Sequence, residues 1–298
     1  MSTIHIIGGK KLEGSIFVQG SKNAALPIMA ATLLTDGVCI LENCPQIADV
    51  KEMIEILKEL GCILWQEGKR VYIMAPEKLN THIDKKHITS MRSSVILLGV
   101  LLSENGYVSM EYPGGCVIGN RPIDMHIMGL KAMGTRFDEN CQVLSASVKQ
   151  LTGAEIKLGF PSVGATENLI LAAVKAKGHT HIYGAAKEPE IVHLCHFLKK
   201  CGAKIWGEGT EYIHIEGVLH LKACKYTIPA DRIVAGTYLM SALATKGAIQ
   251  IKNAPVDEMT EVIRVLKQMG AKMEWNTESI KLYPTEHLQG VFVETKVY

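Results

Sequence analysis

The sequence predicts an α/β protein assembled from repeated units. Four stretches share one pattern, in which an apolar helix, a glycine, a strand, a turn, a second helix, another glycine and a further strand follow one another. The glycines after the first helices are spaced by 69, 72 and 69 residues, at Gly37, Gly106, Gly178 and Gly247. Because one such unit cannot bury both faces of its helices, neighbouring units are expected to pack together.

Short sequence patterns support each element of the unit in turn. Glycine directly after an apolar, periodic run is the usual left-handed end of a helix, so we expect each first helix to end at its glycine. The segments that follow, VCIL, VSMEY, THIY and IQIK, are apolar or alternate, as strands do. A second helix then leads to a second glycine in each unit: Gly61, Gly134, Gly202 and Gly270.

The second unit is longer than the others. Its first and second glycines are 28 residues apart, against 24, 24 and 23 in the other units, and the extra residues fall in the turn PGGCVIG, residues 113–119. Insertions in a repeat lie in loops on one face, often the binding face. The cysteine of this turn, Cys116, is therefore a candidate acid or nucleophile, whereas the other seven cysteines are interpreted as core residues.

Three cations occupy equivalent positions in the repeat. Lys22, Arg92 and Arg232 stand 15, 14 and 15 residues before the first glycine of their units, at the expected start of the first helix. Positive charge is unfavourable there unless an anion binds, and free backbone N–H groups point to the same place. The third unit has PSVGAT, residues 161–166, whose small residues can present N–H groups to a phosphate. The alternative interpretation is that these cations are solvated surface residues.

Overall composition excludes several classes of protein. The formal net charge is +2 over 298 residues, and no basic block indicates a nucleic-acid binder. The first residues show no secretion-signal pattern, and the longest apolar run, residues 95–102, is too short to span a membrane. Eight cysteines without a CxxC pair are typical of reduced thiols. We therefore expect a cytoplasmic chain without nucleic-acid or membrane partners.

Neither a metal nor a cofactor is expected. His193, Cys195 and His196 in VHLCH have ligand-like spacing, but they lie in a second repeat helix whose counterparts hold Lys and Glu. A solvated helix face with one buried thiol is the preferred interpretation. Neither a P-loop nor a GxGxxG stretch occurs.

Acidic residues near helix starts have two interpretations. Asp124 with His126 could form an acid–base pair, although capping and solvent exposure explain them equally well. Glu188 and Glu190 begin a repeat helix, where carboxylates favour the helix dipole without any catalytic role.

Six motifs resemble one family along the whole chain. GSKNAALP, MRSS, PGGCVIGNRPID, PSVGATEN, AAKEPEI and PADRI occur in this order. Together they are similar to the UDP-N-acetylglucosamine enolpyruvyl transferases, enzymes of the first committed step of peptidoglycan synthesis. The related shikimate-pathway enolpyruvyl transferase shares the repeat fold and a GSK-type start, but it is not expected to carry the PGGC turn.

The resemblance implies an inside-out α/β barrel of repeated units, with helices inside and sheets outside. By this resemblance, four of the family's six units are expected in this sequence. Residues 22–229 are expected to form one complete three-unit domain, and residues 1–21 with 230–298 part of a second. Because the apolar helices of the fourth unit would lack partners, we expect the partial domain to be open or poorly ordered. We also expect purified 1–298 to show little or no turnover.

The implied reaction is an addition followed by an elimination. The 3′-hydroxyl of the GlcNAc unit attacks C2 of phosphoenolpyruvate, C3 gains a proton, and phosphate leaves. By the resemblance, Cys116 donates the proton, can bond to phosphoenolpyruvate and is alkylated by fosfomycin. The family's substrate positions match Lys22, Asn23 and Arg121 for phosphoenolpyruvate, and Arg92, Arg121, Pro122, Ile123, Asp124, Met125, Ser162, Val163, Gly164 and Arg232 for UDP-N-acetylglucosamine.

One local departure and two other functions stay open. Phe160 stands where some members carry a basic residue, which weakens one phosphate contact. The chain could instead be a non-catalytic paralogue or fragment that binds UDP-N-acetylglucosamine, or a decayed copy with a structural role. Phosphate release with both substrates separates the enzyme from these alternatives, and calorimetry separates a binder from a scaffold.

Overall fold

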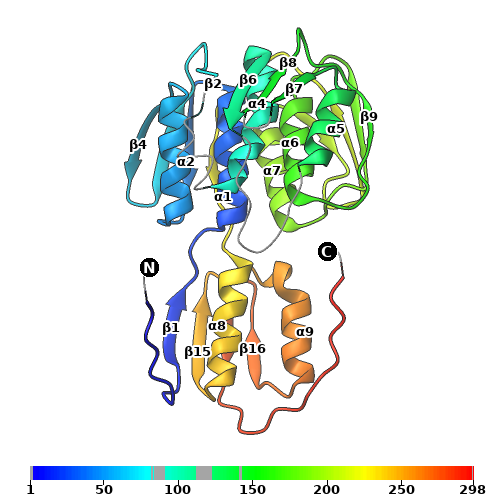
Figure 1. Cartoon of the computed structure of the whole chain (residues 1–298). Helices are drawn as coiled ribbons and strands as arrows, with labels where there is room; N and C mark the ends of the chain where they lie inside the picture. The colour runs from blue at the N-terminus through cyan, green and yellow to red at the C-terminus, as the bar shows by residue number, and fades with distance from the viewer. Residues whose placement is uncertain (1–2, 82, 84–90, 112–122, 141–142, 297) are drawn as a thin grey trace. The chain divides into compact units, whose positions relative to one another are not determined.

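The protein divides into two units. A computed structural model describes residues 3–81, 83, 91–111, 123–140, 143–296 and 298. The smaller unit contains Met1–Ser21 and Pro229–Lys296, and the larger contains Lys22–Ile228 (Figure 1). None of the helices within the described ranges is long and apolar enough to cross a membrane.

The larger unit holds three repeats of the predicted pattern. The first consists of α1 (Lys22–Ala31), η1 (Thr32–Leu34), β2 (Thr35–Asp36), β3 (Val38–Glu42), α2 (Ala48–Glu59), β4 (Ile63–Glu67) and β5 (Arg70–Met74). The second consists of η2 (Arg92–Ile96), α4 (Leu97–Asn105), β6 (Tyr107–Glu111), α5 (Asp124–Ala132), β7 (Arg136–Asn140) and β8 (Val143–Ser147). The third, with the segment that follows it, consists of β9 (Glu155–Lys157), α6 (Val163–Ala173), β10 (His179–Tyr183), α7 (Pro189–Lys200), β11 (Lys204–Trp206), β12 (Tyr212–Glu216), β13 (Leu221–Lys222) and β14 (Lys225–Thr227).

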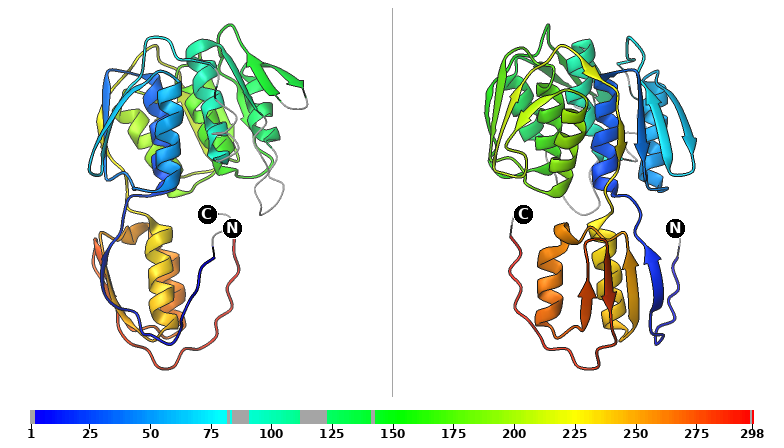
Figure 2. Two further views of the ribbon diagram at one scale, coloured as in Figure 1. Left: turned by 60° about the vertical axis from the view of Figure 1, so that its left-hand side comes forward. Right: turned by 180° about the vertical axis from the view of Figure 1, so that it is seen from behind.

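The first helices of the three repeats form the centre of the larger unit. Residues 24–31 of α1, 97–102 of α4 and 165–173 of α6 are all buried. A helix that is buried on every side needs other elements around it. Figures 1 and 2 show these helices surrounded by the sheets. The predicted arrangement, with helices inside and sheets outside, is therefore confirmed.

The strands expose one side and bury the other. In β3, β5, β6 and β12 the second and fourth residues are buried, whereas the other residues are partly or fully exposed. This period of two is that of a half-buried strand, and it explains why the matching sequence segments alternate.

Each four-stranded sheet adds one edge strand to three antiparallel strands. The orders are β14-β3-β5-β4, β9-β10-β12-β11 and, in the smaller unit, β1-β15-β17-β16. The edge strand pairs in parallel with the strand that follows the first helix of the repeat in every case, and the remaining pairs are antiparallel. Strand β14 therefore joins the end of the third repeat to the sheet of the first and closes the larger unit into a ring.

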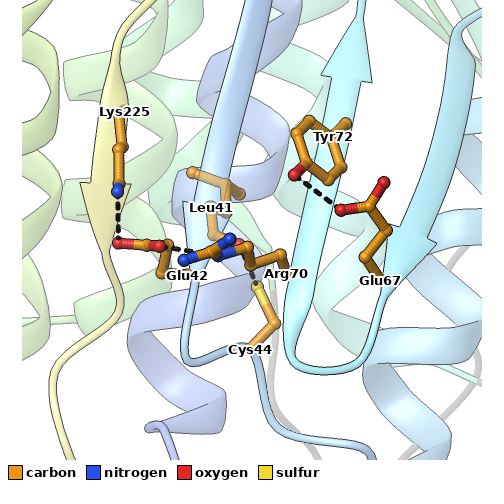
Figure 3. Close-up of polar contacts among 7 residues, drawn as sticks. All are labelled: Leu41, Glu42, Cys44, Glu67, Arg70, Tyr72 and Lys225. Carbon is orange, nitrogen blue, oxygen red and sulfur yellow. Dashed lines mark hydrogen bonds and ion pairs between the residues drawn. The ribbon is translucent and has the colours of Figure 1, made fainter.

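Ion pairs cross this closing seam (Figure 3). Glu42 on β3 binds Lys225 of β14 at 3.0 Å and the Nε of Arg70 on β5 at 2.7 Å. These cations, Lys225 first, lower the pKa of Glu42. Beside them the Tyr72 hydroxyl donates to Glu67 at 2.9 Å. Exposed ion pairs stabilise little, so the seam depends mainly on strand pairing and on the core beneath it.

Glycines end the second helices as predicted, but they do not end most of the first helices. The second helices, including α9 (Thr260–Gln268), end in Schellman motifs whose glycines have φ of 94° to 107°: Gly61, Gly134, Gly202 and Gly270. Of the first helices only α4 ends directly on its glycine, Gly106. The other three stop earlier because additional turns connect them to the next strand. Gly247 is needed instead for a close approach, since an added Cβ would lie 2.0 Å from the Leu12 carbonyl oxygen.

The smaller unit contains the fourth repeat and the N-terminal strand. It consists of β1 (Glu13–Phe17), α8 (Arg232–Ala244), β15 (Ala248–Lys252), η3 (Val256–Met259), α9, β16 (Met273–Trp275) and β17 (Ser279–Leu282). Its separate core includes Leu239, Ile251 and Ile280. The expectation that the helices of the fourth unit lack partners is therefore wrong, because β1 completes the sheet and both helices pack on it. The expectation of an open or poorly ordered domain stays a prediction. Helix α8 does leave Ile233 and Met240 about half exposed.

Candidate active site

A pocket of about 720 Å³ lies where the helices of the larger unit begin. Its walls come from the first turns of α1, α5, α6 and α7, from α2 and from the segment around η2. The lining residues are Lys22, Asn23, Leu26, Pro27, Asp49, Met91, Ser93, Val95, Ile96, Ile123, Met125, His126, Phe160, Pro161, Ser162, Val163, Gly164, Glu167 and Glu190. Helix N-termini carry partial positive charge and unpaired N–H groups, so their convergence suits an anionic ligand.

Lys22 and Asn23, the predicted phosphoenolpyruvate residues, begin α1 and line this pocket. The Nζ of Lys22 lies 2.9 Å from Asp49 Oδ2, and both side chains are almost half exposed. The Asn23 amide donates to Glu190 Oε1 at 3.4 Å. A cation and an amide thus stand together at the start of α1, and an incoming anion must compete with Asp49 for Lys22.

Ser162, Val163 and Gly164 form the start of α6 beside the same pocket, as the sequence predicts for a phosphate-binding segment. Ser162 is the N-cap, and its Oγ accepts from the N–H of Ala165 at 3.4 Å. A Cβ added to Gly164 would lie 3.5 Å from the imidazole of His126. The small residues therefore keep the backbone at this helix start accessible next to His126.

Asn168 of α6 holds three parts of the pocket wall together. Its Oδ1 accepts from the N–H of Gly99 at 2.7 Å, its Nδ2 donates to the Val95 carbonyl at 3.2 Å and lies 2.9 Å from His126 Nδ1. Val95 and Gly99 are four residues apart, so the side-chain amide bridges two backbone groups that an α-helix would pair directly. A Cβ on Gly99 would lie 2.4 Å from the Asn168 carbonyl oxygen, so glycine permits this close packing.

Three carboxyl groups at α6 and α7 lie close together, and two of them, Glu167 and Glu190, line the pocket. Burial raises the pKa of Glu167 well above its usual value, and the charges of Glu190 and Glu188 raise it further. The protonated form of Glu167 is therefore favoured. Glu188 is the N-cap of α7 and Glu190 lies in its first turn, where the helix dipole favours them, as interpreted from the sequence. Glu190 is also buried and lines the pocket, which the sequence did not reveal.

Only some of the remaining predicted site residues line the pocket. Ile123 and Met125 line the pocket, whereas Asp124 between them begins α5 with an exposed side chain and does not line it. Arg92 begins η2. Arg232 begins α8 in the smaller unit, behind the N-cap Asp231. Three predicted residues lie outside the described part of the chain: Cys116, Arg121 and Pro122.

The ligand-like VHLCH segment is an ordinary helix face. Cys195 is fully buried, and burial raises its pKa. His193 lies 3.3 Å from the hydroxyl of Tyr226, whereas about half of the His196 side chain is exposed. Within the described ranges no group of three or more histidine, cysteine or acidic side chains is placed to hold a metal ion. Phe160, the local departure, is 60% exposed at the pocket.

Comparisons with known proteins bring the sequence and the fold together. A family model described as EPSP synthase (3-phosphoshikimate 1-carboxyvinyltransferase) matches residues 6–298. UDP-N-acetylglucosamine 1-carboxyvinyltransferase 2 of Caldanaerobacter subterraneus subsp. tengcongensis is 43% identical over 282 residues, which cover 95% of this chain and 68% of that protein. The UDP-N-acetylglucosamine 1-carboxyvinyltransferase of Lawsonia intracellularis is 41% identical over 298 residues, which cover 100% of this chain and 71% of that protein.

Solved structures share the architecture. The enolpyruvyl transferase NikO from Streptomyces tendae superimposes with a TM-score of 0.83 at 19% identity, over 94% of this chain and 67% of that chain. EPSP synthase from Acinetobacter baumannii gives 0.75 at 20% identity, over 96% of this chain and 68% of that chain. At these identities the likeness shows the fold, which is that of enolpyruvyl transferases. The chain belongs to the EPSP synthase family, in which its curated relatives are UDP-N-acetylglucosamine 1-carboxyvinyltransferases.

Proposed function

We propose that this protein transfers the enolpyruvyl group of phosphoenolpyruvate to the 3′-hydroxyl of UDP-N-acetylglucosamine, in cytoplasmic peptidoglycan synthesis. The observation that carries the proposal is the 43% and 41% identity, along 95% and 100% of the chain, to proteins named for this reaction. Shikimate 3-phosphate is the alternative acceptor, because the family model and one solved neighbour are EPSP synthases. That neighbour is only 20% identical, so UDP-N-acetylglucosamine is favoured.

The pocket supports this proposal because both substrates are anions. Lys22 and Asn23 are proposed to bind the phosphate of phosphoenolpyruvate, with the start of α1 adding its partial positive charge. The backbone N–H groups of Ser162–Gly164 are proposed to bind the diphosphate of UDP-N-acetylglucosamine, next to the apolar wall of Ile123 and Met125. Cations and helix N-termini fixed before the substrates bind stabilise the charge that develops on the departing phosphate.

The proposed proton donor is Cys116, as the family resemblance implies. As the 3′-oxygen bonds to C2 of phosphoenolpyruvate, the thiol would deliver its proton to C3, and the later loss of a C3 proton would expel phosphate. Fosfomycin is proposed to alkylate the same thiol. Brief treatment should give one adduct, on the peptide that contains PGGCVIG, and mass spectrometry would locate it. Adducts spread over several cysteines would remove this role from Cys116.

The test compares acceptors in one phosphate-release assay. Release that requires phosphoenolpyruvate together with UDP-N-acetylglucosamine, and not shikimate 3-phosphate, supports the proposal. Binding of UDP-N-acetylglucosamine in calorimetry without release favours a non-catalytic binding protein, and absence of both overturns the proposed substrate.

A pocket variant connects that substrate to the site. Gly164→Val adds side-chain atoms beside His126 and should weaken UDP-N-acetylglucosamine binding by at least about tenfold, which is about 1.4 kcal/mol. The control Gly290→Ala, where an added Cβ meets nothing within 4 Å, should bind as the parent does.

A further inference from the structure

Three thiols from separate parts of the larger unit meet at its closing seam. Cys39 lies on β3, Cys201 is the C-cap of α7, and Cys224 lies between β13 and β14. The Cys201 thiol donates to Cys224 Sγ, with the two sulfur atoms 3.5 Å apart. Cys39 is in hydrogen-bonding contact with Cys201 as well, and its Sγ lies 3.2 Å from Thr35 Oγ1.

Backbone hydrogen bonds fix the chain on both sides of this cluster. The N–H of Lys222 donates to the Cys201 carbonyl at 2.8 Å, and the N–H of Ile40 donates to the Cys224 carbonyl at 3.1 Å. Strand β13 also pairs with β2 next to Cys39. The two backbones are therefore held together on both sides of a pair of sulfur atoms that lie 3.5 Å apart.

The thiols differ in access and in acidity. Cys39 and Cys201 are buried, whereas Cys224 is only half-buried and is the thiol that a reagent in solution can reach. Contact with the Cys201 thiol is the main cause that lowers the pKa of Cys224 and also the main cause that lowers the pKa of Cys39 to about 7. The same contacts, together with burial, raise the pKa of Cys201 itself. Elsewhere in the same core, burial raises the pKa of Cys62 to about 12. The thiolate is the nucleophile in disulfide exchange, so the half-buried Cys224 with its lowered pKa is the expected attacking thiol.

We propose that Cys201 and Cys224 form a reversible disulfide when the protein meets a low-molecular-weight disulfide. The Cys224 thiolate attacks one sulfur of that disulfide, forms a mixed disulfide and releases one small thiolate. The Cys201 thiol passes its proton to the small thiolate already released and attacks the Cys224 sulfur, which releases the second small thiolate. Two protein thiols are thereby oxidised to one disulfide, and the small disulfide is reduced to two thiols.

The bond would tie the end of α7 to the segment that closes the ring. It joins residues 23 positions apart and therefore restricts the unfolded chain. The oxidised protein should accordingly unfold at a higher temperature than the reduced protein. We expect a rise in Tm of about 5 °C.

Tryptic digestion under non-reducing conditions makes the product easy to identify. Cys201 lies in the peptide CGAK and Cys224 in ACK, whereas Cys39 lies in a long peptide that begins at Asn23. After treatment with oxidised glutathione at neutral pH, we expect a cross-linked CGAK–ACK pair that dithiothreitol removes. The intact chain should lose about 2 Da, corresponding to two hydrogen atoms.

Two variants and the identity of the cross-linked peptides test the proposal. Cys224→Ser should abolish both the cross-link and the Tm rise, whereas the control Cys62→Ala, which removes a buried thiol outside the cluster, should retain both. A cross-link from CGAK to the Cys39 peptide, or a stable glutathione adduct on ACK without a cross-link, would overturn the assignment. A cross-linked pair without any rise in Tm would contradict the proposed effect on the seam.

Discussion

Replacing Asn168 tests whether one side chain assembles the pocket wall. The amide bridges the Val95 carbonyl and the Gly99 N–H, and it also contacts His126. Asn168→Leu keeps a side chain of similar branching, so the change removes hydrogen bonds without opening a large cavity. All of these groups lie in the larger unit, and Asn168 itself is fully buried.

The expected loss follows from the groups left unpaired. A buried backbone donor or acceptor without a partner costs about 1–3 kcal/mol, so the carbonyl and the N–H together cost about 2–6 kcal/mol. A loss of about 3 kcal/mol in a unit of this size lowers its Tm by about 6–12 °C. The lower end of the range applies if Val95 and Gly99 pair directly once the amide is absent.

Differential scanning calorimetry measures this loss, because each unit has its own core. The transition of the larger unit should move, while that of the smaller unit should not. Gln66→Leu is the matched control, since its amide donates to the Gly68 carbonyl at an exposed position and its removal should change stability by no more than about 0.5 kcal/mol. A Tm decrease below about 2 °C for Asn168→Leu would show that the bridge is dispensable and refute the reasoning.

Three further substitutions test the charges of the pocket. The raised pKa of Glu167 means that the folded state keeps a proton which the unfolded state loses, so the free energy of unfolding should fall with rising pH by up to about 1.4 kcal/mol per pH unit. Glu167→Gln should remove this pH dependence in urea unfolding, and the same pH dependence in the variant and the parent would contradict the assignment. Lys22→Met should abolish phosphoenolpyruvate-dependent activity while Tm stays near the parent value, because the Lys22–Asp49 pair is nearly half exposed. Asp49→Asn should tighten phosphoenolpyruvate binding in calorimetry, and an unchanged affinity would show that Asp49 does not compete for Lys22.

The sequence predicts those features that depend on local pattern. The repeat, the alternating strands and the helix starts at Lys22 and Ser162 all follow from neighbouring residues, and these helix starts do line the pocket. Asn168 and Glu167 could not be assigned in this way. The partners of Asn168 lie 42 to 73 residues away, and the pKa of Glu167 depends on carboxyls of another helix. The one available signal was two adjacent polar residues within an apolar helix.

Dependence on distant residues also explains why three of the four first helices end before their glycines. Whether a helix runs on to its glycine depends on the length of the connection to the next strand, and the position of the sheet sets that length. Helix α4 meets Gly106 directly, whereas α1 continues as a tighter turn and enters a short strand before Gly37. The second helices all reach their glycines because each leads straight into an adjacent strand through a Schellman motif.

The placement of the edge strands decides which of the two units each repeat joins. Each four-stranded sheet has a parallel partner at one edge, which pairs N–H and C=O groups that an open edge would leave unpaired. Strand β14 fills that edge for the first repeat and closes the ring of three, so the ring leaves no place for a fourth repeat. The fourth repeat takes β1 instead and forms a separate core. Lys22 and Arg232 occupy equivalent sequence positions, yet strand pairing alone assigns them to different units.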